Sequence, residues 1–264
     1  MRYFLHLEYN GQNFHGWQLQ PNANTIQAEI EDALKKVLRA EIPVVGCGRT
    51  DTGVHASDYY LHFDLEEKLS IPASDFLYKL NGILPESIKI NKLLIPENDE
   101  AHARFSATER TYRYTIITEK DPFMVDFAYR YSAQLDINLM NEACEVMKEY
   151  LDFTSFSKTG TDVGTNNCVI KDAYWQQQNH IIVFTITADR FLRNMVRAIC
   201  GTMLEIGTNK ISIDDFRAII ESKYRGNAGA SVPAKGLCLV EVKYDNSFAE
   251  VSVILNNNNF IKKA

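Results

Sequence analysis

The sequence predicts an α+β protein built from two related halves. Alternating apolar and polar residues mark strands, apolar residues three and four apart mark helices, and the two patterns interchange along the chain. In the first half their order is close to β-α-β-β-α-β, the order of a ferredoxin-like unit, and a similar order returns after Phe105. No repeat of individual residues accompanies it. The 264 residues, 45% of them apolar, suffice for one large domain or two small ones.

The first half is predicted to span residues 1–104. A strand over 2–9 alternates apolar and polar side chains. A helix over 25–40 repeats apolar residues at helical spacing, with Asn24 or Thr25 as its N-cap and Pro43 as its stop. The other elements expected here are strands over 44–48 and 56–65, a helix over 72–80 ended by Asn81-Gly82, and a strand over 88–95.

The second half is predicted to span residues 105–248. A helix over 136–150 carries apolar residues on one face. The other elements expected here are a strand over 111–118, a hairpin of strands 169–177 and 181–188, helices over 191–206 and 212–222, and a strand over 237–244. Residues 249–264 are expected to form a C-terminal strand or tail, in which the asparagine run 256–259 is a polar linker.

Composition disfavours several classes of protein. No run of about 18 apolar residues could cross a membrane, and the first eight residues place charges where a signal peptide needs an unbroken apolar stretch. The five cysteines include no Cys-x-x-Cys pair, so we expect reduced thiols in a cytoplasmic protein, without a structural zinc site. With 28 basic and 34 acidic residues the net charge is −6, yet an acidic protein can still bind nucleic acid through one basic surface.

The densest cluster of special residues is the segment 46–56, with the sequence GCGRTDTGVHA between two predicted strands. Its glycines permit backbone conformations closed to other residues, while Arg49, Asp51 and His55 present a cation, a carboxylate and an imidazole. In most Asp-x-Gly loops the carboxylate only caps backbone N–H groups. Here the apolar strands on both sides anchor the loop, and no metal-ligand spacing is present. We therefore interpret Asp51 as a nucleophile or base.

A second cluster is the segment 102–114, with the sequence HARFSATERTYRY. Three arginines interleaved with three aromatic residues suit phosphate contacts combined with base stacking. On a strand, Arg110, Tyr112 and Tyr114 share one face. The alternative, equally supported by this segment alone, is an edge strand with half-buried tyrosines and solvated arginines.

A third cluster is the segment 188–201, in which Arg190, Arg193 and Arg197 stand at i, i+3 and i+7. On the predicted helix all three lie on one face. Arginine without lysine is the choice expected where a phosphate or carboxylate is held through two hydrogen bonds. The alternative is a solvated face.

Together these segments resemble the TruA-type tRNA pseudouridine synthases. The resemblance extends from about Tyr3 to Tyr244 and has specific motifs in the right order: YNG at 9–11 with GWQ at 16–18, GRTDTGVHA at 48–56, RTYRY at 110–114, FLRNMVR at 191–197 and GLCL at 236–239. It implies the pseudouridine synthase fold, in which two ferredoxin-like halves form one continuous antiparallel sheet with flanking helices and a positively charged central cleft.

The resemblance also implies an activity. Enzymes of this family isomerise uridine to pseudouridine at positions 38, 39 and 40 of the tRNA anticodon arm, as homodimers that need no cofactor or metal. By motif position Asp51 is expected to be the catalytic aspartate and Arg197 its ion-pair partner. Tyr112 is expected to pack on the target base, Leu237 to form an apolar wall of the uracil pocket, and Arg49 to help hold the extruded nucleotide.

The expected chemistry breaks the C1′–N1 bond, turns the base and rejoins it through C5, which requires a carboxylate and a pocket that retains uracil. Asp51 could add to C6, attack C1′ or remove the C2′ proton, and the sequence leaves these routes open. Flipping the nucleotide costs roughly a few kcal/mol. Stacking on Tyr112 and phosphate contacts from Arg110, Arg190 and Arg193 are expected to offset that cost.

Two other functions remain in competition with the synthase. A tRNA-binding module or chaperone would use the same arginines and tyrosines without chemistry, and its function would survive Asp51→Asn. A hydrolase acting on the glycosidic bond would release free uracil, whereas an isomerase leaves the mass of the RNA unchanged.

Overall fold

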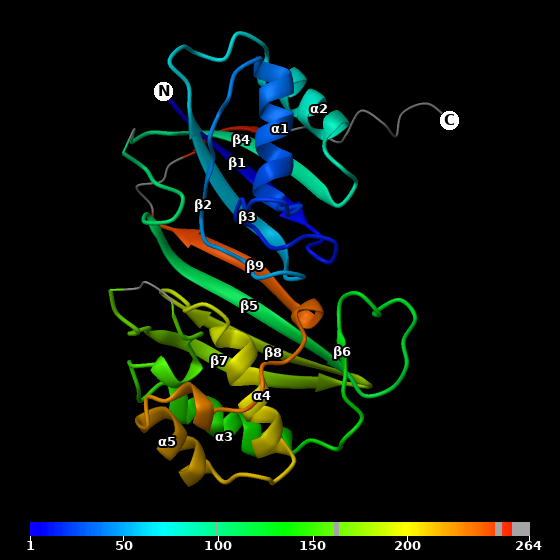
Figure 1. Cartoon of the computed structure of the whole chain (residues 1–264), viewed down its shortest axis with the longest axis vertical. Helices are drawn as coiled ribbons and strands as arrows, with labels where there is room; N and C mark the ends of the chain where they lie inside the picture. The colour runs from blue at the N-terminus through cyan, green and yellow to red at the C-terminus, as the bar shows by residue number, and fades with distance from the viewer. Residues whose placement is uncertain (99, 161–163, 246–249, 255–264) are drawn as a thin grey trace.

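In the residues described by the computed structural model, 1–98, 100–160, 164–245 and 250–254, ten strands form one sheet (Figure 1). The strands are β1 Arg2–Tyr9, β2 Val45–Gly46, β3 His55–Asp64, β4 Ile88–Pro96, β5 Ala107–Ile117, β6 Tyr129–Arg130, β7 Ile170–Gln178, β8 Ile181–Ala188, β9 Leu237–Tyr244 and β10 Glu250–Ile254. Their order along the sheet is β10-β4-β1-β3-β9-β5-β8-β7, with β2 paired to β3 and β6 to β5. One continuous sheet was expected and is confirmed.

The pairing of the strands is mostly, but not wholly, antiparallel. At the centre of the sheet β3 pairs with β9 in parallel, through His55 opposite Cys238 and Ala56 opposite Leu239. The short β6 is also parallel to β5. The expected antiparallel sheet is therefore confirmed for most strand pairs, and the parallel pairs β3–β9 and β5–β6 depart from it. The reason is topological, because β9 inserts between β3 and β5 and, running antiparallel to β5, meets β3 in the same direction.

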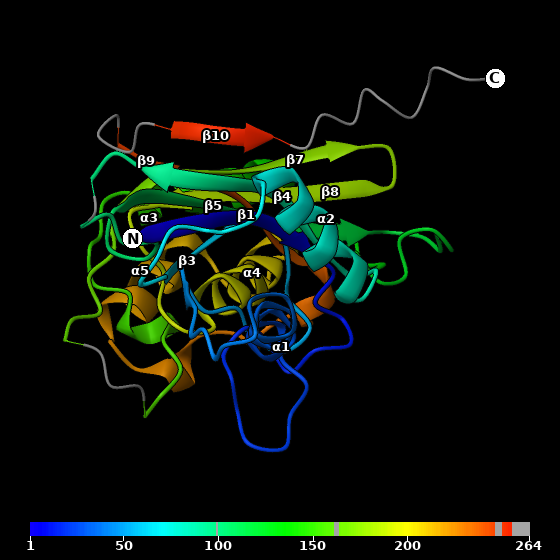
Figure 2. The same ribbon diagram turned by 90° about the horizontal axis from the view of Figure 1, so that it is seen from above.

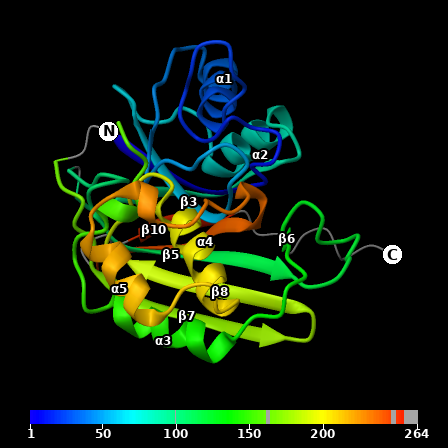
Figure 3. The same cartoon turned by 60° about the horizontal axis from the view of Figure 1, so that its bottom comes forward.

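Five α-helices lie within the described residues: α1 Ile26–Leu38, α2 Ala73–Ile83, α3 Ile137–Met147, α4 Met195–Gly207 and α5 Ile213–Glu221. Short 3₁₀ turns are η1 Thr154–Phe156, η2 Arg225–Asn227 and η3 Ala234–Gly236. Figure 2 shows α1, α4 and α5 on one side of the sheet, and Figure 3 shows α3, α4 and α5 over β5, β8 and β7. Among these described helices none is long and apolar enough to cross a membrane.

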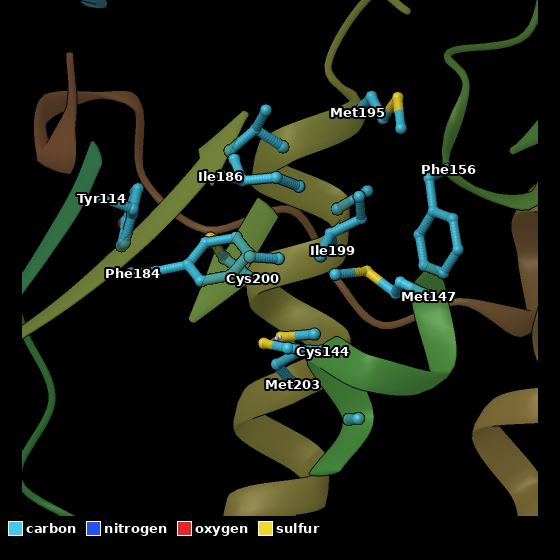
Figure 4. Close-up of a cluster of buried hydrophobic side chains, with 14 of the residues drawn as sticks. Tyr114, Cys144, Met147, Phe156, Phe184, Ile186, Met195, Ile199, Cys200 and Met203 are labelled. Carbon is cyan, nitrogen blue, oxygen red and sulfur yellow. Dashed lines mark hydrogen bonds between the residues drawn. The ribbon is translucent and has the colours of Figure 1, made fainter. Parts of the chain in front are cut away.

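The helices bury two apolar cores against the same sheet. The first core lies under α1 and α2, where alternate β1 residues such as Leu5 and Leu7 are fully buried. The second core lies under α3 and α4, where Met195, Ile199 and Met203 face β8 and α3 (Figure 4). Tyr112 of β5 packs against both cores, so this strand occupies the junction between them.

Capping residues fix several helix starts at the expected places. The Thr25 side chain accepts a hydrogen bond from the N–H of Ala28 at the start of α1. Asp136 does the same for α3. Ser212 and Asp215 form a reciprocal capping box at α5. These starts were predictable because a cap is a local interaction within one turn of the chain.

The predicted end of the second helix is wrong. α2 continues through Asn81 and Gly82 to Ile83. The Asn81 side chain donates to the Ile90 carbonyl at 2.9 Å and accepts from the Ile90 N–H at 2.8 Å. Asn81 therefore fastens the helix to β4 instead of terminating it.

The predicted start of the fourth helix is also wrong. α4 begins at Met195, with Asn194 as a left-handed N-cap at φ 65°. The Asn194 amide donates to Ser231 Oγ at 2.6 Å, a contact from a distant segment that fixes this conformation. Arg190 and Arg193 therefore precede the helix, and the expected stripe of three arginines on one helix face does not form.

The central position of β5 decides between the two interpretations of the segment 102–114. β5 pairs with β9 on one side and β8 on the other. The edge-strand alternative is therefore wrong.

Beyond β9 the backbone of β10 pairs with β4 at one edge of the sheet, whereas the predicted linker 256–259 lies outside the described residues. All five cysteines are free thiols, and four of them are buried.

Candidate active site

The loop that carries Asp51 connects β2 to β3 and packs against the segment that follows β1. We call residues 47–54 the Asp51 loop. The Trp17 N–H donates to the Thr50 carbonyl at 3.1 Å, and the Gly53 N–H donates to the Phe14 carbonyl at 3.2 Å. Buried Tyr9 shares a 2.8 Å hydrogen bond with Thr50 Oγ1. The Asp51 loop therefore rests on a packed support.

This support requires glycine where the two segments approach most closely. A Cβ on Gly11 would lie 1.9 Å from the Val54 carbonyl oxygen, and one on Gly16 would lie 2.5 Å from that of Thr50. Gly16 also has φ +89°, a conformation that other residues rarely adopt. The segment 11–16 therefore packs against the backbone of the Asp51 loop.

We expect Gly11→Ala to destabilise the protein by about 1–3 kcal/mol, since a backbone carbonyl cannot move aside for the added methyl group. The melting temperature would then fall by roughly 3–10 °C. Gly48→Ala is the matched control, because a Cβ there meets no atom within 4 Å. Equal melting temperatures for the two variants would contradict this close packing.

Two arginines at the start of α4, Arg193 just before the helix and Arg197 in its first turn, form ion pairs with the Asp51 carboxylate. Arg197 Nη1 lies 3.6 Å from Asp51 Oδ2, and Arg193 Nε lies 3.8 Å from Oδ1. Arg197 is the more buried of the two, with 20% of its side chain exposed against 58% for Arg193. Its Nε donates to the Val232 carbonyl at 2.8 Å, which aims the guanidinium at the carboxylate. Asp51 itself is 25% exposed and so remains open to a substrate.

An aromatic ring on β5 lies near this ion pair, and an apolar residue begins the neighbouring strand β9. The Tyr112 ring meets Phe191 edge to face, with centroids 5.1 Å apart. Burial raises the pKa of the Tyr112 hydroxyl, and the charge of nearby Asp51 raises it further, so the ring is neutral. Leu237 begins β9 and is 6% exposed.

His55, the first residue of β3, connects the end of the Asp51 loop to three other segments. Its Nδ1 accepts a hydrogen bond from the Gly11 N–H at 3.1 Å, which leaves Nε2 as the protonated nitrogen. Nε2 lies 3.0 Å from the Asp126 carbonyl and 3.1 Å from that of Lys235. Burial lowers the pKa of this imidazole, which favours the neutral form that these bonds require. His55 therefore holds these segments together.

The Arg110 guanidinium faces the backbone. Its Nη1 donates to the carbonyls of Ala107 and Asp189, both at 2.8 Å, and its Nη2 donates to those of Cys47 at 3.2 Å and Arg104 at 2.6 Å. Four of its five N–H donors are therefore engaged within the protein. Arg110 joins the start of the Asp51 loop to β5 and to the segment before α4.

The structure brings most of the predicted site residues to one place. Asp51, Arg193 and Arg197 form ion pairs, and Tyr112 is close enough to Asp51 for the carboxylate charge to raise the pKa of its hydroxyl. Arg49 is exposed on the Asp51 loop itself. The part of the chain described here contains no group of three His, Cys, Asp or Glu side chains placed to hold a metal ion.

Sequence reasoning gave no role to two residues near this site. His55 was noted only as part of the glycine-rich segment, and its partners come from three loops far apart in sequence. Arg104 was noted only as part of a basic cluster. No local pattern could place either one, because both positions depend on tertiary contacts.

An ion-paired carboxylate, an adjacent aromatic ring and exposed arginines on one mixed α/β scaffold suit an enzyme that acts on a polyanionic substrate. The comparisons with known proteins give this class a family. A family model described as tRNA pseudouridine synthase matches residues 150–245.

Relatives named tRNA pseudouridine synthase A match nearly the whole chain. The Parabacteroides distasonis protein is 54% identical over 92% of this chain and 96% of its own length. The Bacteroides fragilis protein is 50% identical over 94% of this chain and 98% of its own length. The Bacillus subtilis protein is 41% identical over 93% of this chain and 100% of its own length. The chain belongs to the tRNA pseudouridine synthase A family. The predictions of this family and of an enzyme are confirmed.

Proposed function

We propose that this protein isomerises uridine to pseudouridine at positions 38, 39 and 40 of the tRNA anticodon arm, with Asp51 as the nucleophile on a flipped-out uridine. The observation that carries the proposal is the Asp51 carboxylate, partly exposed and held by Arg197 and Arg193 beside the Tyr112 ring. Family membership supports the reaction and the substrate. The pairing of a carboxylate with buried and exposed arginines supports the assignment of Asp51.

The reaction breaks the C1′–N1 bond, turns the uracil and forms a C1′–C5 bond, after which the C5 proton is lost and N1 gains a proton. We propose that the Asp51 carboxylate forms the transient bond, at C6 or at C1′; removal of the C2′ proton is the competing route. Arg197 orients the carboxylate and neutralises it while the uridine binds. The close packing around the Asp51 loop keeps the free base in place until it reattaches.

The other site residues act on the substrate in this proposal. Arg49 and Arg190 bind phosphates beside the flipped nucleotide, Arg193 closes the exposed side of the carboxylate, and Leu237 forms the apolar wall of the uracil pocket. For Arg110 we propose a positioning role in place of a substrate contact, because four carbonyls already occupy its guanidinium.

We expect Tyr112→Phe to keep activity within about threefold of the wild type and Tyr112→Ala to lose about tenfold or more, because the ring supplies stacking worth about 1–3 kcal/mol per base. Single-turnover rates with a tRNA transcript measure this. Equal losses in the two variants would assign the role to the hydroxyl instead.

We propose further that the chain divides into a ferredoxin-like half over 1–104, a second over 105–248 and a C-terminal strand and tail over 249–264. The two cores support this division, as does the order β9-β5-β8-β7 in the second half. A positively charged cleft between the halves, a homodimer and a cytoplasmic location complete the proposal, which is consistent with tRNA as substrate.

The test is to incubate the protein with an unmodified tRNA transcript and to map pseudouridine by carbodiimide-dependent primer extension. The proposal predicts stops at positions 38 to 40 when uridine stands there, and RNA of unchanged mass. Bound tRNA without stops would favour the binding module. Released uracil would favour the hydrolase.

A further inference from the structure

An exposed aromatic ring lies in the turn 102–106, just before β5 begins. Phe105 is 76% exposed, although large apolar side chains are usually buried. Its ring lies 4.4 Å from that of His102, centroid to centroid, and the Arg104 guanidinium carbon lies 5.5 Å from the ring centroid. An aromatic ring beside a guanidinium is suited to bind a nucleotide through stacking and charge together.

The turn that presents Phe105 is held by side chain and backbone bonds. His102 Nδ1 accepts from the N–H groups of Arg104 at 3.1 Å and Phe105 at 3.2 Å. The His102 N–H donates to Ser106 Oγ at 2.9 Å, and the Ser106 N–H donates back to the His102 carbonyl at 3.0 Å. The backbone that carries the ring is therefore ordered before a ligand arrives, which lowers the entropic cost of binding.

Three arginines without a carboxylate partner surround this turn. Arg110 fastens together the segments that carry Arg49, Arg104 and Arg190 by donating to carbonyls in or next to each of them. Burial lowers the pKa of Arg104, and the charges of Arg49 and Arg190 lower it further, in line with this crowding. Among the described residues none of the three forms an ion pair. A concentration of cations that the protein leaves unneutralised is a site for an anionic ligand.

The positive charge of these three arginines favours RNA over protein as the partner of the exposed ring. A protein partner would need carboxylates to meet three cations, whereas an RNA strand supplies phosphates and bases at regular spacing. Arg49 belongs to the Asp51 loop and lies two residues before Asp51. A strand held here would therefore lie next to the loop that carries Asp51.

We propose that Phe105 is the stacking platform of a second nucleotide subsite beside the reacting uridine. A base of the bound RNA strand lies on the Phe105 ring, and Arg49, Arg104 and Arg190 hold the phosphates that flank it. The proposal rests on the proposed function only in taking tRNA as the substrate. The subsite contributes affinity and positions the strand, without touching the reacting atoms.

The test measures the dissociation constant of a tRNA transcript as a function of salt for wild type and variants. We expect Phe105→Ala to bind about 5- to 100-fold more weakly with an unchanged salt slope, because stacking releases no counterions. Phe105→Tyr keeps the affinity within about twofold because a ring remains. Arg104→Gln and Arg190→Gln each weaken binding and lower the slope of log Kd against log salt by about 0.7–0.9.

Tyr78→Ala is the matched control, since Tyr78 is 77% exposed on α2 and has no part in the subsite. Thermal unfolding of each variant verifies the fold. The proposal is overturned if Phe105→Ala binds like Tyr78→Ala, if its salt slope falls, or if it changes the oligomeric state instead of the affinity. A parallel assay of product keeps the two questions apart: weakened binding by Phe105→Ala in a protein that forms no pseudouridine would refute the function and retain the subsite.

Discussion

Asp51→Asn is expected to abolish pseudouridine formation, with a rate loss of at least about 10⁴-fold, the order found when one essential catalytic group is removed. An amide has nearly the same shape as the carboxylate but is a poor nucleophile, so the contacts of the loop can persist while the chemistry fails. The measurement is the single-turnover rate on a tRNA transcript at saturating enzyme. Affinity for the transcript should stay within about threefold of the wild type, because the surrounding arginines supply most of the attraction.

Asp51→Glu provides the control for charge. It keeps the carboxylate but displaces it by one methylene, which a site that requires placement within about 0.5 Å does not tolerate. A large loss in both variants, with unchanged thermal unfolding, supports a positioned nucleophile. Near-native turnover by Asp51→Asn would remove Asp51 from the chemistry and return it to the role of a turn residue.

Arg197→Ala is expected to lower the single-turnover rate by about 10²–10³-fold, the usual cost of removing one fixed electrostatic contact from an active site. Arg197 is the better buried of the two arginines on Asp51, and the Val232 carbonyl fixes its direction. Its loss leaves the carboxylate without its main orienting partner.

Two matched variants are expected to show smaller losses of rate than Arg197→Ala. Arg193→Ala removes the more exposed arginine and is expected to cost only about tenfold, as solvent screens exposed pairs. Arg197→Lys keeps a charge but not the planar guanidinium, so it should fall between the wild type and Arg197→Ala. If Arg193→Ala were as damaging as Arg197→Ala, the proposed division between the two residues would be contradicted.

Local patterns in the sequence were sufficient to predict most of the longer elements and the Asp51 loop. The helices capped by Thr25, Asp136 and Ser212 start where expected, because each cap bonds within one turn of its own position. The Asp51 loop was recognisable because its glycines and charged residues are adjacent in sequence. The order of the motifs along the chain made the resemblance to the tRNA pseudouridine synthases specific.

Contacts between distant segments account for what the sequence could not predict. The left-handed cap at Asn194 depends on Ser231, so the true start of α4 was hidden from helical periodicity. The insertion of β9 beside β3 created the parallel pair. The sequence named Arg110 as a candidate phosphate contact, but three of the carbonyls that it binds come from other segments. The sequence was sufficient to predict which kinds of side chain form the site. Their contact partners could be identified only from the folded structure.

The most direct test of the central claim uses tRNA transcribed with uridine that carries tritium at C5. Pseudouridine formation must release that label to water, because C5 becomes bonded to C1′. We predict release of one tritium per modified uridine by the wild type, RNA of unchanged mass, and no release by Asp51→Asn despite bound tRNA. Release by Asp51→Asn at the wild-type rate, or no release by a wild-type protein that binds tRNA, would contradict the account.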